Sequence, residues 1–160
     1  MGANRPGAAA VHVILVRHGQ SASNAGLASQ DPATIPLTDL GHAQARYVAQ
    51  ELGQVPDLIV TSNYLRAQAT AAPAIARFPT TRVEAWPIHE FTFLPQAAYS
   101  GTTASQRQGA AKAYWQAGKP QRVSGAGAES FADFPRRHVI WPVAKIFRLR
   151  VRTTSNDQTN

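Results

Sequence analysis

The stretch VHVILVRHGQSASN, residues 11–24, decides the predicted fold of this chain. Residues 11–16 are apolar except for His12, and their β-branched side chains predict a short strand that is buried on both faces. Arg17 and His18 follow this strand directly, without a polar spacer. A strand end is rigid, so it holds a guanidinium and an imidazole at fixed positions. We therefore expect a functional site at this point of the chain.

The composition is that of a globular domain. The chain has 160 residues, of which 44% are hydrophobic and 16% are charged, so a core of useful size can form. No apolar run is long enough to span a bilayer, and residues 1–10 lack the apolar centre of a signal peptide. The absence of cysteine excludes disulfides and thiolate metal sites. These features predict a cytoplasmic protein with no membrane partner and a flexible lead over residues 1–10.

Two more short apolar runs, residues 57–62 and 82–86, predict strands, and segments of helical periodicity separate and follow them. The expected helices cover residues 37–53, 62–72 and 105–117, and residues 127–131 begin a fourth. Thr38 is the expected N-cap of the first helix, whose apolar face includes Leu40 and Tyr47. Ser62 can cap the second helix, which Pro73 should kink or end, and residues 91–103 are expected to form a long loop. Alternating strands and helices predict an α/β fold with a mainly parallel sheet and helices on both faces. We expect one domain over residues 11–135 and a separate basic tail over residues 136–160.

Side chains that do chemistry collect at the carboxyl ends of the strands in such a sheet. Arg17 and His18 follow the first predicted strand. Arg66 lies just beyond the second, and Glu90 lies just beyond the third. Arginine presents a fork of donors that matches phosphate oxygens, and a histidine between two arginines stays neutral more readily and can attack phosphorus. Because a carboxyl group can protonate the leaving oxygen, these residues predict phosphoryl transfer without a metal or another cofactor.

The order of these motifs resembles that of the histidine phosphatase superfamily, also called phosphoglycerate mutase-like proteins. The Arg-His-Gly triplet at residues 17–19 is similar to the family's RHG signature. Four later segments resemble family segments in the same order: LTDLGHAQA (37–45), TSNYLRAQATA (61–71), HEFTFLPQAAYSGTT (89–103) and GAESFADF (127–134). The resemblance extends over about residues 10–134. It implies the three-layer α/β sandwich of that family.

The resemblance also implies a role for each candidate site residue. His18 would be the nucleophile that forms a phosphohistidine. Arg17, Arg66 and Asn24 would hold the phosphoryl group, although a plain turn residue is an equally good interpretation of Asn24. Glu90 would be the general acid and then the base for water, with a loop carboxylate as the alternative. No metal enters this scheme.

The chain departs from the family pattern after Phe134. The family has a second histidine in a strand that ends Ser-His-Gly, and no such segment follows here, since His138 precedes an apolar run and has no glycine after it. IFRLRVRT, residues 146–153, has instead the alternation of a half-exposed strand. A truncation or a change of reading frame near residue 135 is one hypothesis for this loss. The sheet is then expected to lack its last central strand, which leaves residues 11–16 with an open edge and predicts a homodimer through that edge.

These observations predict a phosphomonoester hydrolase whose partner is a phosphorylated small molecule or a phosphoprotein. The alternative is a relic that binds phosphate groups weakly or without turnover, because the second histidine is missing. Residues 136–160 carry six Lys and Arg against Asp157 alone. A solvated tail is the preferred interpretation of this charge, and we expect no nucleic-acid partner.

Overall fold

A computed structural model describes residues 11–136 of this chain. The expected lead at residues 1–10 lies outside the described residues. So does the tail predicted at residues 136–160, apart from Arg136, together with the strand pattern at 146–153. Among residues 11–136, no helix is both long and apolar enough to cross a membrane.

Two parallel strands form the centre of the larger part of the molecule. β1 (Leu58–Ser62) pairs with β2 (Arg82–Trp86), and their register places Leu58 opposite Arg82 and Ser62 opposite Trp86. Both strands lie where the sequence predicts them. Their parallel pairing requires a crossover, which the helix between them provides. The α/β fold class with a parallel sheet is thereby confirmed.

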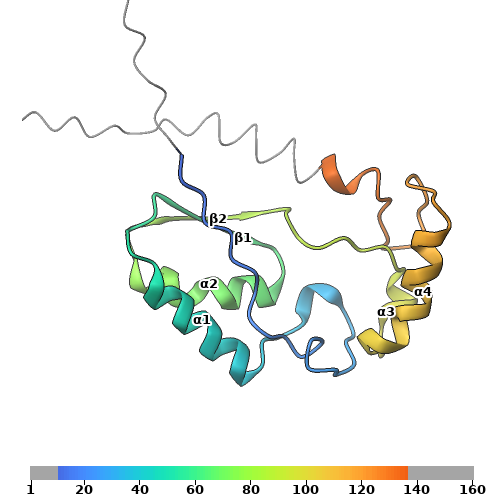
Figure 1. The fold of residues 1–160 in the computed structure, drawn as a ribbon, viewed down its shortest axis with the longest axis horizontal. Coiled ribbons are helices and arrows are strands. Elements are labelled where there is room, and N and C mark those ends of the chain that lie inside the picture. The colour runs from blue at the N-terminus through green and yellow to red at the C-terminus, as the bar shows by residue number, and fades with distance from the viewer. Residues whose placement is uncertain (1–10, 137–160) are drawn as a thin grey trace, which may run out of the picture.

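Helices α1 (Asp39–Glu51) and α2 (Leu65–Arg77) lie side by side next to this pair of strands (Figure 1). Three small side chains of these helices are buried: Ala45 and Ala49 on α1, and Ala74 on α2. Small residues let two helices approach closely, and Arg77 of α2 also donates to the carbonyl of Gln50 near the end of α1, at 2.7 Å. These contacts make the helix pair a compact support for the strand ends.

The local signals at the helix ends are only partly as predicted. Thr38 caps α1 as expected, since its Oγ1 accepts from the Gly41 amide at 3.1 Å. The sequence predicts that Pro73 kinks or ends the second helix. The helix does not end there, because α2 continues through Pro73 to Arg77. Proline removes one donor from the helix, and the packing of α2 outweighs that loss. Ser62 does not cap α2, which has Tyr64 at its N-cap position.

The first predicted strand is wrong. Residues 11–16 join no sheet within the described chain, and Val13, Ile14 and Leu15 are 68%, 71% and 91% exposed. The apolar pattern shows only that this run is suited to burial. A strand also needs a neighbouring strand whose backbone groups hydrogen-bond to its own. Among residues 11–136 only β1 and β2 form a sheet, and residues 11–16 are not part of it.

A smaller part of the molecule carries α3 (Gln96–Tyr99) and α4 (Ala104–Gln116), beside the larger part in Figure 1. The sequence predicts a loop where the short α3 forms. The helix predicted at residues 105–117 is α4, which begins one residue earlier, at Ala104. Thr103 and Gln106 form a capping box at that end of the helix. The fourth helix expected from residues 127–131 begins later than predicted, since residues 125–133 form turns and irregular chain and residues 134–136, the last that the structure describes, are helical.

An aromatic cluster is the core of this smaller part. The Phe91 ring lies at its centre, with ring centroids 5.3–6.0 Å away. Its neighbours are Phe93, Tyr114, Trp115, Phe131 and Phe134. Contacts of this kind add to the hydrophobic burial of the rings. They fix the chain segment that follows β2, and Glu90 lies in that segment.

Candidate active site

His18 lies in the loop between residues 11–16 and α1, and two contacts orient its ring. Nδ1 is 2.7 Å from the Gly19 carbonyl, and Nε2 is 3.0 Å from Oε1 of Glu90. A carbonyl oxygen only accepts, so Nδ1 carries the proton and Nε2 faces Glu90. The side chain is 11% exposed. Nε2 is therefore the ring atom that is placed for chemistry.

Arg66 reaches the same carboxylate from the first turn of α2. Its side chain is only 3% exposed, and its NH2 group is 2.8 Å from Oε2 of Glu90. The NH1 group donates to the Pro32 carbonyl at 2.6 Å, and the guanidinium lies 4.7 Å from the Tyr64 ring centroid. A buried guanidinium needs such acceptors and a counter-ion to offset its lost hydration. The Glu90 carboxylate is that counter-ion.

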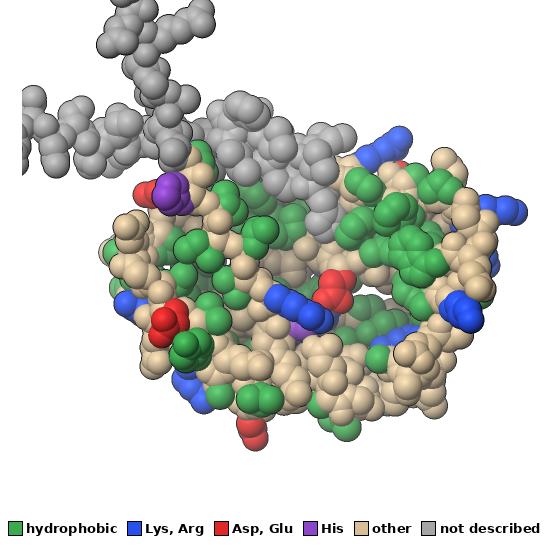
Figure 2. All heavy atoms as spheres, viewed as in Figure 1, with side chains coloured by type: hydrophobic (Ala, Val, Ile, Leu, Met, Phe, Trp, Pro, Cys, Tyr) green, Lys and Arg blue, Asp and Glu red, His purple; other side chains and the backbone are tan. Residues whose placement is uncertain are grey.

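Glu90 bridges the His18 ring and the Arg66 guanidinium. One carboxylate oxygen faces the histidine ring and the other faces the guanidinium, while the side chain itself is 63% exposed. An anionic group thus lies between a ring nitrogen and an arginine fork, at an opening to solvent. Figure 2 shows basic, acidic and histidine side chains together between two areas of hydrophobic side chains, where this face is hollowed.

Thr70 is a site residue that sequence reasoning missed. Its hydroxyl accepts from the Gly19 amide at 3.0 Å and donates to the Arg66 carbonyl at 2.7 Å. The donated bond is a helical back-bond over four residues, and the accepted bond spans 51 residues. Thr70 therefore ties the loop of His18 to the helix of Arg66. Only the TA pair at the end of TSNYLRAQATA signals it in the sequence.

The loop after His18 is locked to the start of α1. Gln20 donates its amide to the Gln44 side chain at 2.8 Å, and its own side-chain oxygen accepts from Thr38 at 2.7 Å. Gly19 and Gly41 lie so close that a Cβ on either would collide with a backbone carbonyl. Glycine at both positions is thus a requirement of this close approach.

Arg17 and Asn24 do not join the Glu90 contacts. Arg17 is exposed and makes no ion pair within residues 11–136. Asn24 closes a local turn, in which its Oδ1 accepts from the amide and the hydroxyl of Ser21 at 3.2 and 2.9 Å. The structure thus brings together three of the five predicted site residues, His18, Arg66 and Glu90. The phosphate-binding roles of Arg17 and Asn24 stay predictions.

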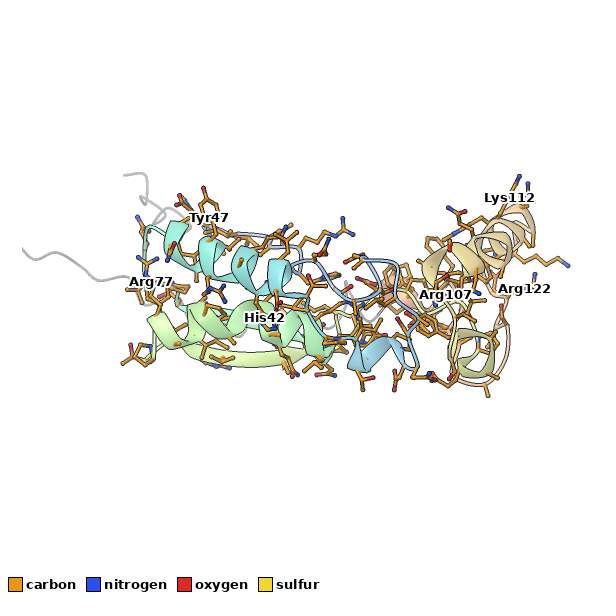
Figure 3. All side chains as sticks on the ribbon, turned by 90° about the horizontal axis from the view of Figure 1, so that it is seen from below. His42, Tyr47, Arg77, Arg107, Lys112 and Arg122 are labelled. Carbon is orange, nitrogen blue, oxygen red and sulfur yellow. The ribbon has the colours of Figure 1, made fainter. Side chains whose placement is uncertain are left out.

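An open hollow lies next to the site, between residues 17–19 and the outer side of α1. Leu40 and Tyr47 line it and are 53% and 62% exposed, although the sequence places them on the apolar face of the helix. Figure 3 shows Tyr47 projecting from α1 on the side away from α2. The apolar face of α1 and the apolar residues 11–16 are therefore both uncovered in the described chain.

The chemistry available at this site is that of acids, bases and cations. Residues 11–136 contain no group of three or more His, Cys, Asp or Glu side chains that could hold a metal ion. The site offers a ring nitrogen as a nucleophile, a carboxyl group that can exchange a proton, and a guanidinium that binds oxyanions.

Comparison with known proteins identifies the same family as the motifs. The family model described as histidine phosphatase superfamily (branch 1) matches residues 13–142, a few residues beyond the end of the resemblance predicted from the sequence. A curated relative, the mitochondrial serine/threonine-protein phosphatase Pgam5 of Drosophila virilis, is 41% identical over 63 residues. That match covers 38% of this chain and 20% of the relative.

Solved structures of similar fold are larger than this chain. A putative alpha-ribazole-5'-P phosphatase from Escherichia coli matches with a TM-score of 0.65 and 25% identity, over 84% of this chain and 66% of that one. A mycobacterial glucosyl-3-phosphoglycerate phosphatase in complex with VO3 matches with a TM-score of 0.64 and 27% identity, over 82% and 63% of the two chains. The present chain thus spans less than two thirds of these proteins.

Proposed function

This chain belongs to the histidine phosphatase superfamily (branch 1), and on that premise we propose that it hydrolyses phosphomonoesters through a phosphohistidine at His18. The observation that carries the proposal is the Glu90 carboxylate, which contacts the His18 ring nitrogen at 3.0 Å and the Arg66 guanidinium at 2.8 Å. His18 and Arg66 together contact the Glu90 carboxylate, so the same two side chains can contact a phosphoryl group, which is also an anion. A phosphoryl group between them would meet the nucleophile on one side and the guanidinium on the other.

The first step transfers the phosphoryl group to the histidine. Nε2 of His18 forms a bond to phosphorus as the bond from phosphorus to the ester oxygen breaks. Arg66 stabilises the negative charge on the equatorial oxygens. Glu90, as a neutral carboxylic acid, gives its proton to the leaving ester oxygen, so that an alcohol departs. The Nδ1 contact with the Gly19 carbonyl stabilises the positive charge on the ring.

The second step returns the enzyme to its starting state. Glu90, now a carboxylate, removes a proton from water, and the water oxygen attacks phosphorus. The bond between phosphorus and Nε2 then breaks, and inorganic phosphate leaves. Because the Glu90 side chain is largely exposed, it can move aside for the phosphoryl group and still exchange protons with water. This scheme uses no metal or other cofactor.

The relatives support a phosphorylated substrate. Their names describe phosphatases of an alpha-ribazole phosphate, of glucosyl-3-phosphoglycerate and, for the curated relative, of a serine/threonine phosphoprotein. We propose the class that these share, a phosphate monoester on a small molecule or on a protein. A cytoplasmic location is part of the same proposal.

Trapping of the phosphoenzyme tests the proposal. We expect p-nitrophenyl phosphate to label the protein with phosphate in an acid-labile, alkali-stable form and to be hydrolysed in the presence of EDTA. His18→Ala should abolish both the label and the turnover. His42→Ala is the matched control, because His42 is exposed on α1 and takes no part in the Glu90 contacts. Equal labelling of His18→Ala and the parent would overturn the proposal.

A phosphate-binding protein without turnover is the second candidate. One observation favours it: residues 135–160, which follow the GAESFADF segment, contain no Ser-His-Gly. The loss of one preorganised donor lowers a catalytic rate by about 10²–10³-fold. Under this candidate, phosphate raises the melting temperature while the trapping experiment yields no label.

We also propose self-association through the uncovered apolar residues. Val11, Val13, Ile14 and Leu15 are each at least 60% exposed, and a continuous apolar run of this kind is rare on a monomer. Light scattering after size exclusion would give a dimer for the parent chain. A monomer at all concentrations would contradict this proposal.

A further inference from the structure

Tyr64, the N-cap residue of α2, contacts both of the segments that carry Arg66 and Glu90. The residue is buried, with 8% of its surface exposed, and its amide donates to the Ser62 hydroxyl at the end of β1, at 3.3 Å. The backbone on the two sides of Tyr64 belongs to β1 and to α2, so it is held in place. A side chain on such a rigid support can fix the positions of its neighbours.

The ring of Tyr64 supports the Arg66 guanidinium. The central carbon of the guanidinium lies over the ring, 4.7 Å from its centroid, which is within the range of a cation–π interaction. The Arg66 side chain is only 3% exposed, so water screens this attraction little. Together with the bond from NH1 to the Pro32 carbonyl, the ring orients the guanidinium so that NH2 faces Glu90.

The hydroxyl of Tyr64 reaches the segment of Glu90. It lies 3.1 Å from the Thr92 hydroxyl, which donates to the Glu90 carbonyl at 3.4 Å. A hydroxyl has one proton to donate, so Thr92 accepts from Tyr64 when it donates to Glu90. On the other side of Glu90, the centroid of the His89 ring is 4.8 Å from that of the Tyr64 ring. Tyr64 therefore contacts the chain both before and after the acid.

These contacts form a closed network, in which the positions of the guanidinium and of the carboxyl group depend on each other. Its members, in order, are Arg66, Tyr64, Thr92 and Glu90, whose carboxylate returns to Arg66. A phosphoryl group that enters the site displaces this last contact, and the other three remain. Tyr64 then links the group that binds phosphate to the segment that carries the acid.

We propose that Tyr64 is a positioning residue with two separable roles. Its ring orients Arg66 for binding of the phosphoryl group. Its hydroxyl acts through Thr92 and orients Glu90 for proton transfer to the leaving oxygen. This inference rests on the proposed function, because it needs both the phosphate site and the acid. The alternative is a buried tyrosine that contributes only to folding.

Two variants separate the roles. Tyr64→Phe keeps the ring and should bind inorganic phosphate as the parent does. Its turnover of phenyl phosphate should fall about tenfold more than that of p-nitrophenyl phosphate, because phenolate is the poorer leaving group and depends more on the acid. Tyr64→Leu removes the ring, and its affinity for phosphate should fall about threefold to thirtyfold, as expected for the loss of a cation–π contact.

Tyr99→Leu is the matched control. The Tyr99 ring lies 4.0 Å from the Arg107 guanidinium, so this variant removes the same kind of contact outside the site. Thr92→Val tests the route through the hydroxyls. If Tyr64 acts on Glu90 through Thr92, the double variant should change the ratio of the two turnover rates no more than either single variant does.

Calorimetry with phosphate, turnover of both esters and melting temperatures give the outcome. If the parent neither binds phosphate nor hydrolyses either ester, the proposed function fails, and this inference fails with it. If the parent binds phosphate and hydrolyses both esters, two results overturn only the present inference: unchanged phosphate affinity in Tyr64→Leu, or an unchanged ratio of turnover rates in Tyr64→Phe. Lower melting temperatures with the same affinity and the same ratio would leave Tyr64 a purely structural role. Weaker phosphate binding in Tyr64→Leu together with a changed ratio in Tyr64→Phe supports the proposal.

Discussion

The first apolar run and the β1–β2 sheet have similar sequences and opposite surroundings. Residues 11–16 and Leu58–Ser62 are both short, apolar and rich in β-branched side chains. β1 is bonded to β2 along its length, with Ser62 and Thr61 buried, whereas Leu15 in the first run is 91% exposed. An apolar pattern therefore specifies a strand only where a neighbouring strand can hydrogen-bond to its backbone.

The two regions nevertheless supply one site. His18 follows the exposed run and Arg66 follows β1. No strand pairing joins these two segments in the described chain, and two side-chain contacts join them instead. Thr70 bonds the loop of His18 to the helix of Arg66, and Glu90 contacts the side chains of both His18 and Arg66. The site is therefore joined by side-chain contacts, and no continuous sheet lies beneath it in the described chain.

The largest expected effect comes from breaking the bridge between the two regions. Glu90→Gln keeps the shape of the side chain and removes both the acid and the internal anion. We expect turnover of p-nitrophenyl phosphate to fall by about 10²–10⁴-fold. Inorganic phosphate should bind more tightly, because no carboxylate competes for Arg66. Glu51→Gln is the control, because Glu51 is exposed at the end of α1, and calorimetry with phosphate gives the affinity. Weaker phosphate binding in Glu90→Gln would show that Glu90 does not occupy the anion position.

Truncation of one side chain in each region tests the contrast in packing. Trp86 ends β2 and is 5% exposed, so Trp86→Ala should lower the free energy of unfolding by about 3–5 kcal/mol. Leu15→Ala removes an exposed side chain, and the change should be below about 0.5 kcal/mol. Urea titrations at low protein concentration measure both values. A large loss in Leu15→Ala would mean that residues 11–16 are packed in solution.

The two arginines at the ends of the two runs sharpen the comparison further. Arg66 is buried against Glu90, and Arg17 is exposed. We expect Arg66→Gln to weaken phosphate binding by about 10–100-fold, because it removes a charge-assisted contact at a partly buried site. Arg17→Gln should have the smaller effect. Calorimetric titration with phosphate measures the loss of affinity in each variant. If the two variants lose equal affinity, Arg17 has the full role in phosphate binding that the family resemblance implies.

A modest effect is expected at the Thr70 hydroxyl, which joins the two regions. Thr70→Val keeps the shape and loses the acceptor for the Gly19 amide, which should cost about 1 kcal/mol in the free energy of unfolding. Thr70→Ser keeps the hydroxyl and serves as the control. A positioning role also predicts a fall in kcat in Thr70→Val that Thr70→Ser restores. If the valine and serine variants unfold and turn over alike, the hydroxyl has no such role.

The local features of this protein were determined by the sequence itself. Apolar periodicity and a capping threonine predict β1, β2 and α1, because these signals act between residues that are close in the chain. The motifs also identify His18, Arg66 and Glu90, since phosphoryl transfer needs a nucleophile, a cation that binds oxyanions and a proton donor. The family follows from the order of the same motifs.

Only the tertiary structure decided which of these signals were realised. Whether residues 11–16 become a strand depends on backbone partners far away in the chain, and a local pattern carries no information about their presence. The Glu90 bridge, the Thr70 bond over 51 residues and the hydrogen bond from Arg107 to the Ser23 hydroxyl are likewise contacts between distant segments. The sequence determined which groups could meet, and the packing of the described chain decided which of them do.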